Sequence, residues 1–78
     1  MTTFTEKERK ALLDLKGVGE TVIRRFEEIG IDSFERLKEY EAEDIAEMVA
    51  NMLHTTCWKN SPFARKAIQS AIELAREN

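Results

Sequence analysis

Apolar residues recur along this chain at the three- and four-residue spacing of amphipathic helices, and no segment alternates as a strand would. One full helical pattern is formed by Ile45, Met48, Val49, Met52 and Leu53. Another is formed by Ala64, Ala67, Ile68, Ala71, Ile72 and Ala75. Met48 and Met52 occupy core positions of the first pattern, so we expect them to pack inside the protein rather than to line a binding groove. The spacing predicts an all-α protein.

Capping signals mark where two helices begin in the first half of the chain. Thr5 and Glu8 have the spacing of a capping box, which predicts a helix over residues 6–14. Ser33 is a suitable N-cap for a short helix over residues 34–40, because its hydroxyl can accept a hydrogen bond from a backbone N–H of the first turn. Both helices are therefore predicted to begin directly after a short hydroxyl side chain.

The second half of the chain contains two longer helices. The first begins at Ala42 or Glu43, and the acidic residues of its first turn complement the positive end of the helix dipole. Residues 54–60 are predicted to form a loop. Ser61 followed by Pro62 is typical of an N-cap and a first helical position, so the last helix is expected to begin there.

Two glycines separated by one apolar residue, Gly17-Val18-Gly19, precede a helix predicted over residues 20–29. Glycine permits a sharp turn and a close approach of a ligand to the backbone. The helix that follows begins with unpaired N–H groups and a partial positive charge, which suit a phosphate. Gly30 is expected to end that helix in a left-handed conformation. The turn is a candidate phosphate-binding hairpin, or a tight turn that packs two helices and binds nothing.

Residues 15–37 read L-K-G-V-G-E-T-V-I-R-R-F-E-E-I-G-I-D-S-F-E-R-L and resemble a helix-hairpin-helix motif. The resemblance and the order of the elements imply a compact five-helix, SAM-like bundle. In that plan residues 54–60 form a degenerate second helical hairpin without glycines, and residues 1–78 form a single domain. With its C-W and N-S-P-F-A-R-K-A-I segments, the chain is also similar to small bacterial helix-hairpin-helix proteins of the pathogenicity-locus type, some of which carry a mitomycin-resistance label.

In DNA-binding members of the motif, hairpin N–H groups contact phosphates with help from nearby basic side chains. The resemblance implies a DNA phosphate-binding site made of Lys16, Gly17, Val18, Gly19, Thr21, Arg24 and Arg25, joined in the doubled plan by Lys59, Arg65 and Lys66. Such contacts would be weak and non-specific, because backbone donors carry no base code. Lys16 stands where many members have proline. Glu20 is a carboxylate at a helix N-terminus and would compete with a phosphate there.

The charge distribution supports a second hypothesis. The net charge is −3, and residues 31–56 contain Arg36 and Lys38 against seven acids, whereas residues 57–78 carry more basic than acidic groups. The two acidic helices of the middle segment could bind a protein partner, or the basic end of another copy in a head-to-tail self-association. A positive surface around the hairpin would favour DNA, and an acidic one would favour protein.

Other chemistry has little support in the sequence. His54 and Cys57 have the spacing of metal ligands, but the chain has no second histidine or cysteine to complete a metal site. Without a grouped acid, base and nucleophile, we expect no enzymatic activity, no cofactor and no small-molecule substrate. Trp58 is expected to close one end of the bundle. One cysteine, no export signal and no long apolar run predict a cytoplasmic protein without membrane association.

Overall fold

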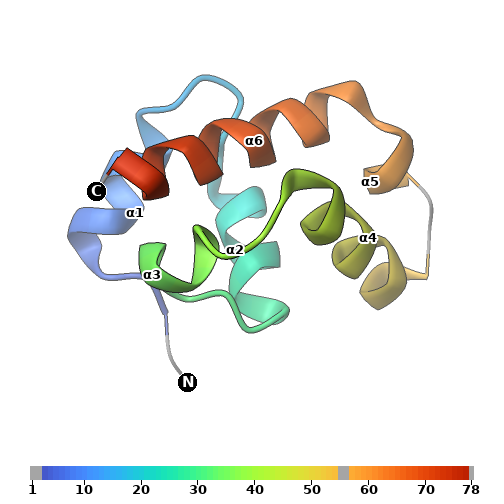
Figure 1. The fold of residues 1–78 in the computed structure, drawn as a ribbon, viewed down its shortest axis with the longest axis horizontal. Coiled ribbons are helices and arrows are strands. Elements are labelled where there is room, and N and C mark those ends of the chain that lie inside the picture. Colours follow the sequence, from blue (N-terminus) through green and yellow to red (C-terminus); the bar gives the residue numbers. More distant parts are fainter. Residues whose placement is uncertain (1–2, 55–56, 78) are drawn as a thin grey trace.

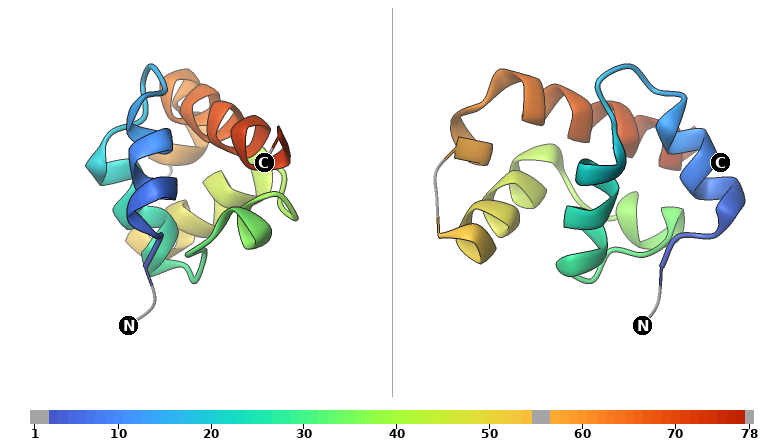
Figure 2. Two further views of the ribbon diagram at one scale, coloured as in Figure 1. Left: turned by 90° about the vertical axis from the view of Figure 1, so that its left-hand side faces the viewer. Right: turned by 180° about the vertical axis from the view of Figure 1, so that it is seen from behind.

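The longest helix, α6, runs across the whole molecule, with α1 near its C-terminal end and α4 and α5 near its N-terminal end (Figure 1). This computed structural model describes residues 3–54 and 57–77, and all regular elements in these two ranges are helices. Their bounds are α1 Glu6–Leu13, α2 Glu20–Glu28, α3 Phe34–Leu37, α4 Ala42–Leu53, α5 Cys57–Asn60 and α6 Pro62–Glu77. Helix α3 packs against α6, and α2 lies between α1 and α4 (Figure 2).

The described ranges contain six helices, whereas the sequence predicted five. The additional one is α5, a single turn within residues 54–60, which were predicted to be entirely loop. Helix α3 ends at Leu37 rather than at residue 40. Helix α4 ends where His54 adopts a left-handed conformation with a φ of 54°. A single turn has no periodic apolar signal, and tertiary packing decides whether it forms, so the pattern of the sequence could not place these short elements.

The helix caps lie at the predicted positions. The Thr5 hydroxyl accepts a hydrogen bond from the Glu8 N–H at 3.2 Å, and the Glu8 carboxylate accepts one from the Thr5 N–H at 3.1 Å, which completes a capping box. The second carboxylate oxygen of Glu8 accepts a hydrogen bond from the Phe34 N–H at 3.0 Å and so ties α1 to the start of α3. The Ser33 hydroxyl caps α3 by accepting a hydrogen bond from the Arg36 N–H, and the Ser61 hydroxyl caps α6 by accepting one from the Ala64 N–H.

Helix α2 ends as the sequence predicted, in a left-handed glycine. Gly30 has a φ of 92°, and its N–H donates to the Glu27 carbonyl at 3.1 Å. The Ile31 N–H donates to the Phe26 carbonyl at 2.8 Å, so the two bonds together form a Schellman motif. Ile31 is fully buried and packs back on the structure that it follows. This ending fixes the direction in which the chain leaves α2.

The hydrophobic core draws on every helix from α1 to α4 and on α6. Its largest fully buried side chains are Leu12, Ile23, Phe26, Ile31, Leu37, Ile45, Val49, Ile68 and Ile72. The ring centroid of Phe4 lies 6.5 Å from that of Phe26 and 6.4 Å from that of Phe34, so aromatic contacts join the N-terminal segment to α2 and α3. The core therefore holds α2, and with it the turn that precedes α2, in a fixed position.

Candidate nucleic-acid interface

The turn between α1 and α2 is closed by a backbone hydrogen bond and anchored by a buried side chain. The Val18 N–H donates to the Leu15 carbonyl at 3.2 Å. Gly17 occupies the third position of this turn with a φ of 88°, the sign that a type II turn requires there. The side chain of Val18 is only 5% exposed and belongs to the core. The buried Val18 therefore anchors the turn to the core, while Lys16 and Gly17 are exposed at its tip.

Gly17→Ala should lower the free energy of unfolding by about 1–2 kcal/mol, because a left-handed conformation costs a non-glycine residue about that much. A Cβ at Gly17 would meet no atom within 4 Å, so backbone strain is the only penalty. Gly17→Asn is the matched control, since it adds a Cβ at the same position and asparagine tolerates the left-handed conformation. Urea denaturation compares the two variants, and equal midpoints would show that Gly17 is not strained.

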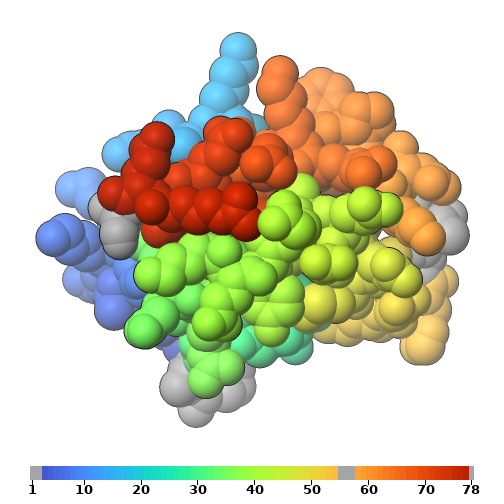
Figure 3. Space-filling model, viewed as in Figure 1, coloured from blue at the N-terminus to red at the C-terminus, as the bar shows by residue number. Residues whose placement is uncertain are grey.

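The tip of this turn and the first half of α6 border one hollow of about 250 Å³. It is lined by Lys16, Gly17, Phe63, Lys66, Ala67 and Ser70. The turn arches beside α6 (Figure 2), and the light-blue surface of the turn rises next to the orange surface of α6 at the upper edge of the space-filling view (Figure 3). Two segments about 50 residues apart in the sequence thus meet at one place.

Both lysines of this hollow are exposed, and neither is within 4 Å of a carboxylate of the described residues. The nearby carboxylate of Glu20 forms an ion pair with the Arg9 guanidinium at 2.7 Å. Glu20 makes no cap on α2, whose N-cap is Gly19 and which has no side-chain cap. Within the described part of the chain, the N–H groups of Gly17 and Gly19 also make no hydrogen bond. Positive charge and free N–H donors therefore coincide at this turn.

The other predicted site residues lie outside the hollow. Thr21, Arg24, Lys59 and Arg65 are exposed on α2, α5 and α6 but do not line it, and neither do Val18, Gly19 and Arg25. The Val18 N–H is already used by the turn. Arg25 forms an ion pair with Glu28 at 2.7 Å, and its buried Nε has no hydrogen-bond partner among the described residues. Arg25 is thus the least available cation of the predicted set.

Phe63, Ala67 and Ser70 line the hollow but were not among the predicted site residues, and Phe63 is the largest of the three. It is 86% exposed, although it is a large aromatic side chain on the first turn of α6. The signal that could have found it is its register, because Phe63 falls outside the apolar face that runs from Ala64 to Ala75. A second helical face, at spacings of three, four and seven residues from Phe63, contains Lys66, Ala67 and Ser70 and borders the turn.

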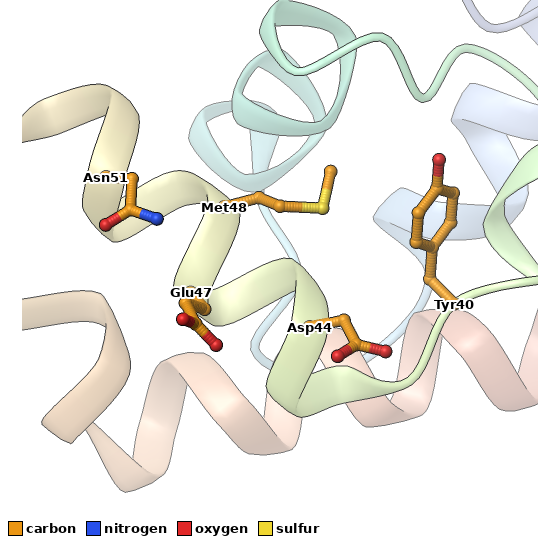
Figure 4. A pocket seen from close by; sticks show the side chains of 5 residues that line it. All are labelled: Tyr40, Asp44, Glu47, Met48 and Asn51. Carbon is orange, nitrogen blue, oxygen red and sulfur yellow. The ribbon is translucent and has the colours of Figure 1, made fainter.

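A second hollow, of about 370 Å³, lies between α4 and the segment that precedes it. It is lined by Tyr40, Asp44, Glu47, Met48 and Asn51, and in the close-up the side chains of Asp44 and Met48 extend from α4 towards Tyr40 (Figure 4). Met48 is half-buried and packs against the core, as predicted, but it also lines this hollow. The acidic segment of the sequence thus forms a surface with an apolar floor and two carboxylates.

The described residues hold no group of three or more side chains that could bind a metal ion. The side chain of Cys57, half of the H-x-x-C pair, lies outside the described part of the structure. Trp58 is half-buried and packs against the core, as expected of a residue that closes the bundle. Among the helices described, none has both the length and the apolar character needed to cross a membrane.

No protein-family model, no curated protein and no solved structure matches this chain. The hypotheses about its function are therefore judged on the residues at the two hollows. Of these, the hollow between the turn and α6 combines two cations, a glycine whose N–H is free among the described residues, and an exposed aromatic ring. The hollow beside α4 combines carboxylates with a tyrosine and a methionine.

Proposed function

We propose that this chain is a non-catalytic helix-hairpin-helix module that binds DNA phosphates weakly and without sequence specificity. The observation that carries the proposal is that Lys16 and Lys66, both exposed and unpaired among the described residues, line one hollow at the glycine turn. A phosphate in this hollow would meet two ammonium groups and the exposed backbone of Gly17, whose N–H is free among the described residues, whereas the free N–H of Gly19 lies on the same turn outside the hollow. These donors recognise the sugar–phosphate backbone, which is the same for every sequence.

The overall charge limits how tightly such contacts can hold DNA. The chain has a net charge of −3, so its long-range field repels a polyanion. The local cations act at short range, where two lysines face no competing carboxylate within 4 Å among the described residues. Each phosphate contact releases condensed counterions, so the affinity should fall steeply with salt. We therefore expect binding at low salt that is lost as the salt concentration rises.

Gly19→Asp should separate binding from stability. An aspartate at this N-cap can accept a hydrogen bond from the first turn of α2, so the free energy of unfolding should rise by a few tenths of a kcal/mol, about the difference between Asp and Gly at this position. The new carboxylate would stand on the same turn as Gly17, beside the hollow in which a phosphate is proposed to bind. DNA affinity should then fall by about twofold or more, since like charges about 8 Å apart in water repel by about 0.5 kcal/mol.

Ser33→Asp is the matched control for this variant. It adds the same charge at the N-cap of α3, where an aspartate can also replace the existing cap. Fluorescence anisotropy of labelled DNA measures the affinity of both variants, and chemical denaturation measures their stability. If the Gly19→Asp protein binds DNA as tightly as the Ser33→Asp protein, the glycine turn does not contact DNA.

The hollow beside α4 favours a second candidate function, a SAM-like interaction module that self-associates through its acidic segment. Asp44 and Glu47 flank the apolar surface of Tyr40 and Met48, and the exposed Phe63 with Lys66 on another copy would complement both its charge and its apolar floor. Such a head-to-tail contact joins two different surfaces and can propagate. Sedimentation over a range of protein concentrations distinguishes the two functions, because a chain that remains monomeric does not self-associate.

A further inference from the structure

We infer that the hollow between the turn and α6 binds single-stranded DNA, with an unpaired base stacked on Phe63 and neighbouring phosphates held by Lys16 and Lys66. This inference rests on the proposed phosphate contacts and adds the form of the nucleic acid to them. It starts from the one aromatic side chain in the hollow, which is 86% exposed.

The exposure of Phe63 is not explained by the packing of α6. This helix buries Ala67, Ile68, Ala71, Ile72 and Ala75 on its core-facing side. Phe63 lies off that side, and the only other large hydrophobic side chain that is exposed among the described residues is Leu13, at 40%. An aromatic ring in this position contributes nothing to the core, but it offers a flat apolar face to a ligand. Bases stack on such faces in proteins that bind single strands.

The lysines that line the hollow with Phe63 could bind the phosphates on either side of a stacked base. Lys66 lies one helical turn after Phe63 on the same face of α6, and Ser70 lies one turn further. Lys16 approaches from the turn on the other side of the hollow. A ring flanked by cations from two elements is the combination that single-strand-binding surfaces use, in which stacking holds the bases and cations follow the backbone.

The form of the hollow favours a single strand over a duplex. In a duplex the base faces are stacked inside the double helix, so a phenyl ring reaches them only after unstacking. In a single strand the faces are accessible. A ring that lies open on the surface beside a hollow of about 250 Å³ can therefore stack on a base that is already unpaired.

The test compares three fluorescently labelled ligands of about 16 nucleotides, the upper end of the site sizes of single-strand-binding folds. They are an oligothymidylate strand, a strand of the same length with abasic sites, and a duplex. The wild-type protein should bind the oligothymidylate about fivefold or more tightly than the abasic strand, since stacking of one base contributes about that factor.

Phe63→Ala should remove the preference for the oligothymidylate and leave the affinity for the abasic strand unchanged. Phe63→Trp should restore the preference, because indole also stacks on bases. Leu13→Ala is the control for loss of an exposed apolar side chain and should change neither affinity. Circular dichroism confirms that each variant keeps its helices.

Three outcomes would overturn the inference, and they differ in what they say about the phosphate contacts. If wild-type protein binds the oligothymidylate and the abasic strand equally well, stacking is absent and the proposed phosphate contacts stand. If Phe63→Ala weakens binding to both strands by the same factor, Phe63 does not stack on a base. If no ligand binds at about 20 mM salt, where surface electrostatics are strongest, both the stacking and the phosphate contacts are refuted.

Discussion

Phe26→Ala should remove a large part of the stability of this protein. Phe26 is fully buried on α2, its ring lies 6.5 Å from that of Phe4, and its carbonyl accepts the hydrogen bond that ends the helix. Truncation of a buried phenylalanine to alanine costs about 3–5 kcal/mol, because apolar contacts are lost and a cavity remains. A domain of 78 residues has a total stability of only about 4–12 kcal/mol. One substitution can therefore remove most of it.

Thermal denaturation followed by circular dichroism measures this effect. Each kcal/mol corresponds to about 4–8 °C for a domain of this size, so the melting temperature should fall by more than about 12 °C. Phe63→Ala is the matched control, because it makes the same chemical change at a side chain that is 86% exposed. That variant should melt close to the wild type. A Phe26→Ala protein that melts within a few degrees of the wild type would contradict the central position of α2 in the core.

Reversal of both lysines of the hollow, Lys16→Glu with Lys66→Glu, should abolish measurable DNA binding. A hydrogen bond to a charged group contributes about 1.5–3 kcal/mol, so each reversal alone should weaken binding by about tenfold or more. Each lost phosphate contact should also make the slope of log affinity against log salt shallower by about one unit. Both side chains are exposed, so the fold should survive.

The control for this double variant is Lys7→Glu with Lys38→Glu. It makes the same change in net charge at two exposed lysines that do not line the hollow. Anisotropy titrations at low salt compare the two proteins. The affinity of the control should fall only by the amount that its extra negative charge produces at long range. Equal loss in both double variants would mean that DNA responds to the net charge and not to this site.

Local chemistry explains why much of the fold could be predicted. Thr5 with Glu8 is a capping box whose two hydrogen bonds lie within four residues, and Gly30 ends α2 through bonds to the turn just before it. Such features depend only on residues that are close in the sequence, so the sequence predicts them. The single-turn α5 packs against α4 and α6 and is too short to show a periodic apolar pattern, and the left-handed conformation of His54 is uncommon for a residue other than glycine. No local pattern marks them, so the helix count was too low by one.

In the candidate site, too, some features could be predicted from the sequence and others could not. The sequence singled out ten residues, the glycine turn among them, and the structure brings Lys16, Gly17 and Lys66 of this set to one hollow. The ion pair of Arg25 with Glu28 joins residues three apart on α2 and was readable from the sequence, whereas the ion pair of Arg9 with Glu20 joins α1 to α2 and was not. The position of Phe63 outside the apolar face of α6 indicates an exposed ring, but the sequence interpretation did not compare Phe63 with that face.

The salt dependence of binding to a short labelled DNA duplex tests the central claim most directly, because a duplex reports on phosphate contacts without any contribution from Phe63. If the turn and α6 hold phosphates through Lys16 and Lys66, the wild-type protein binds at about 20 mM salt. A plot of log affinity against log salt then falls with a slope of about −2, as expected for two phosphate contacts. An absence of binding at that salt concentration, or an affinity that salt does not change, would contradict the assignment of this surface to DNA.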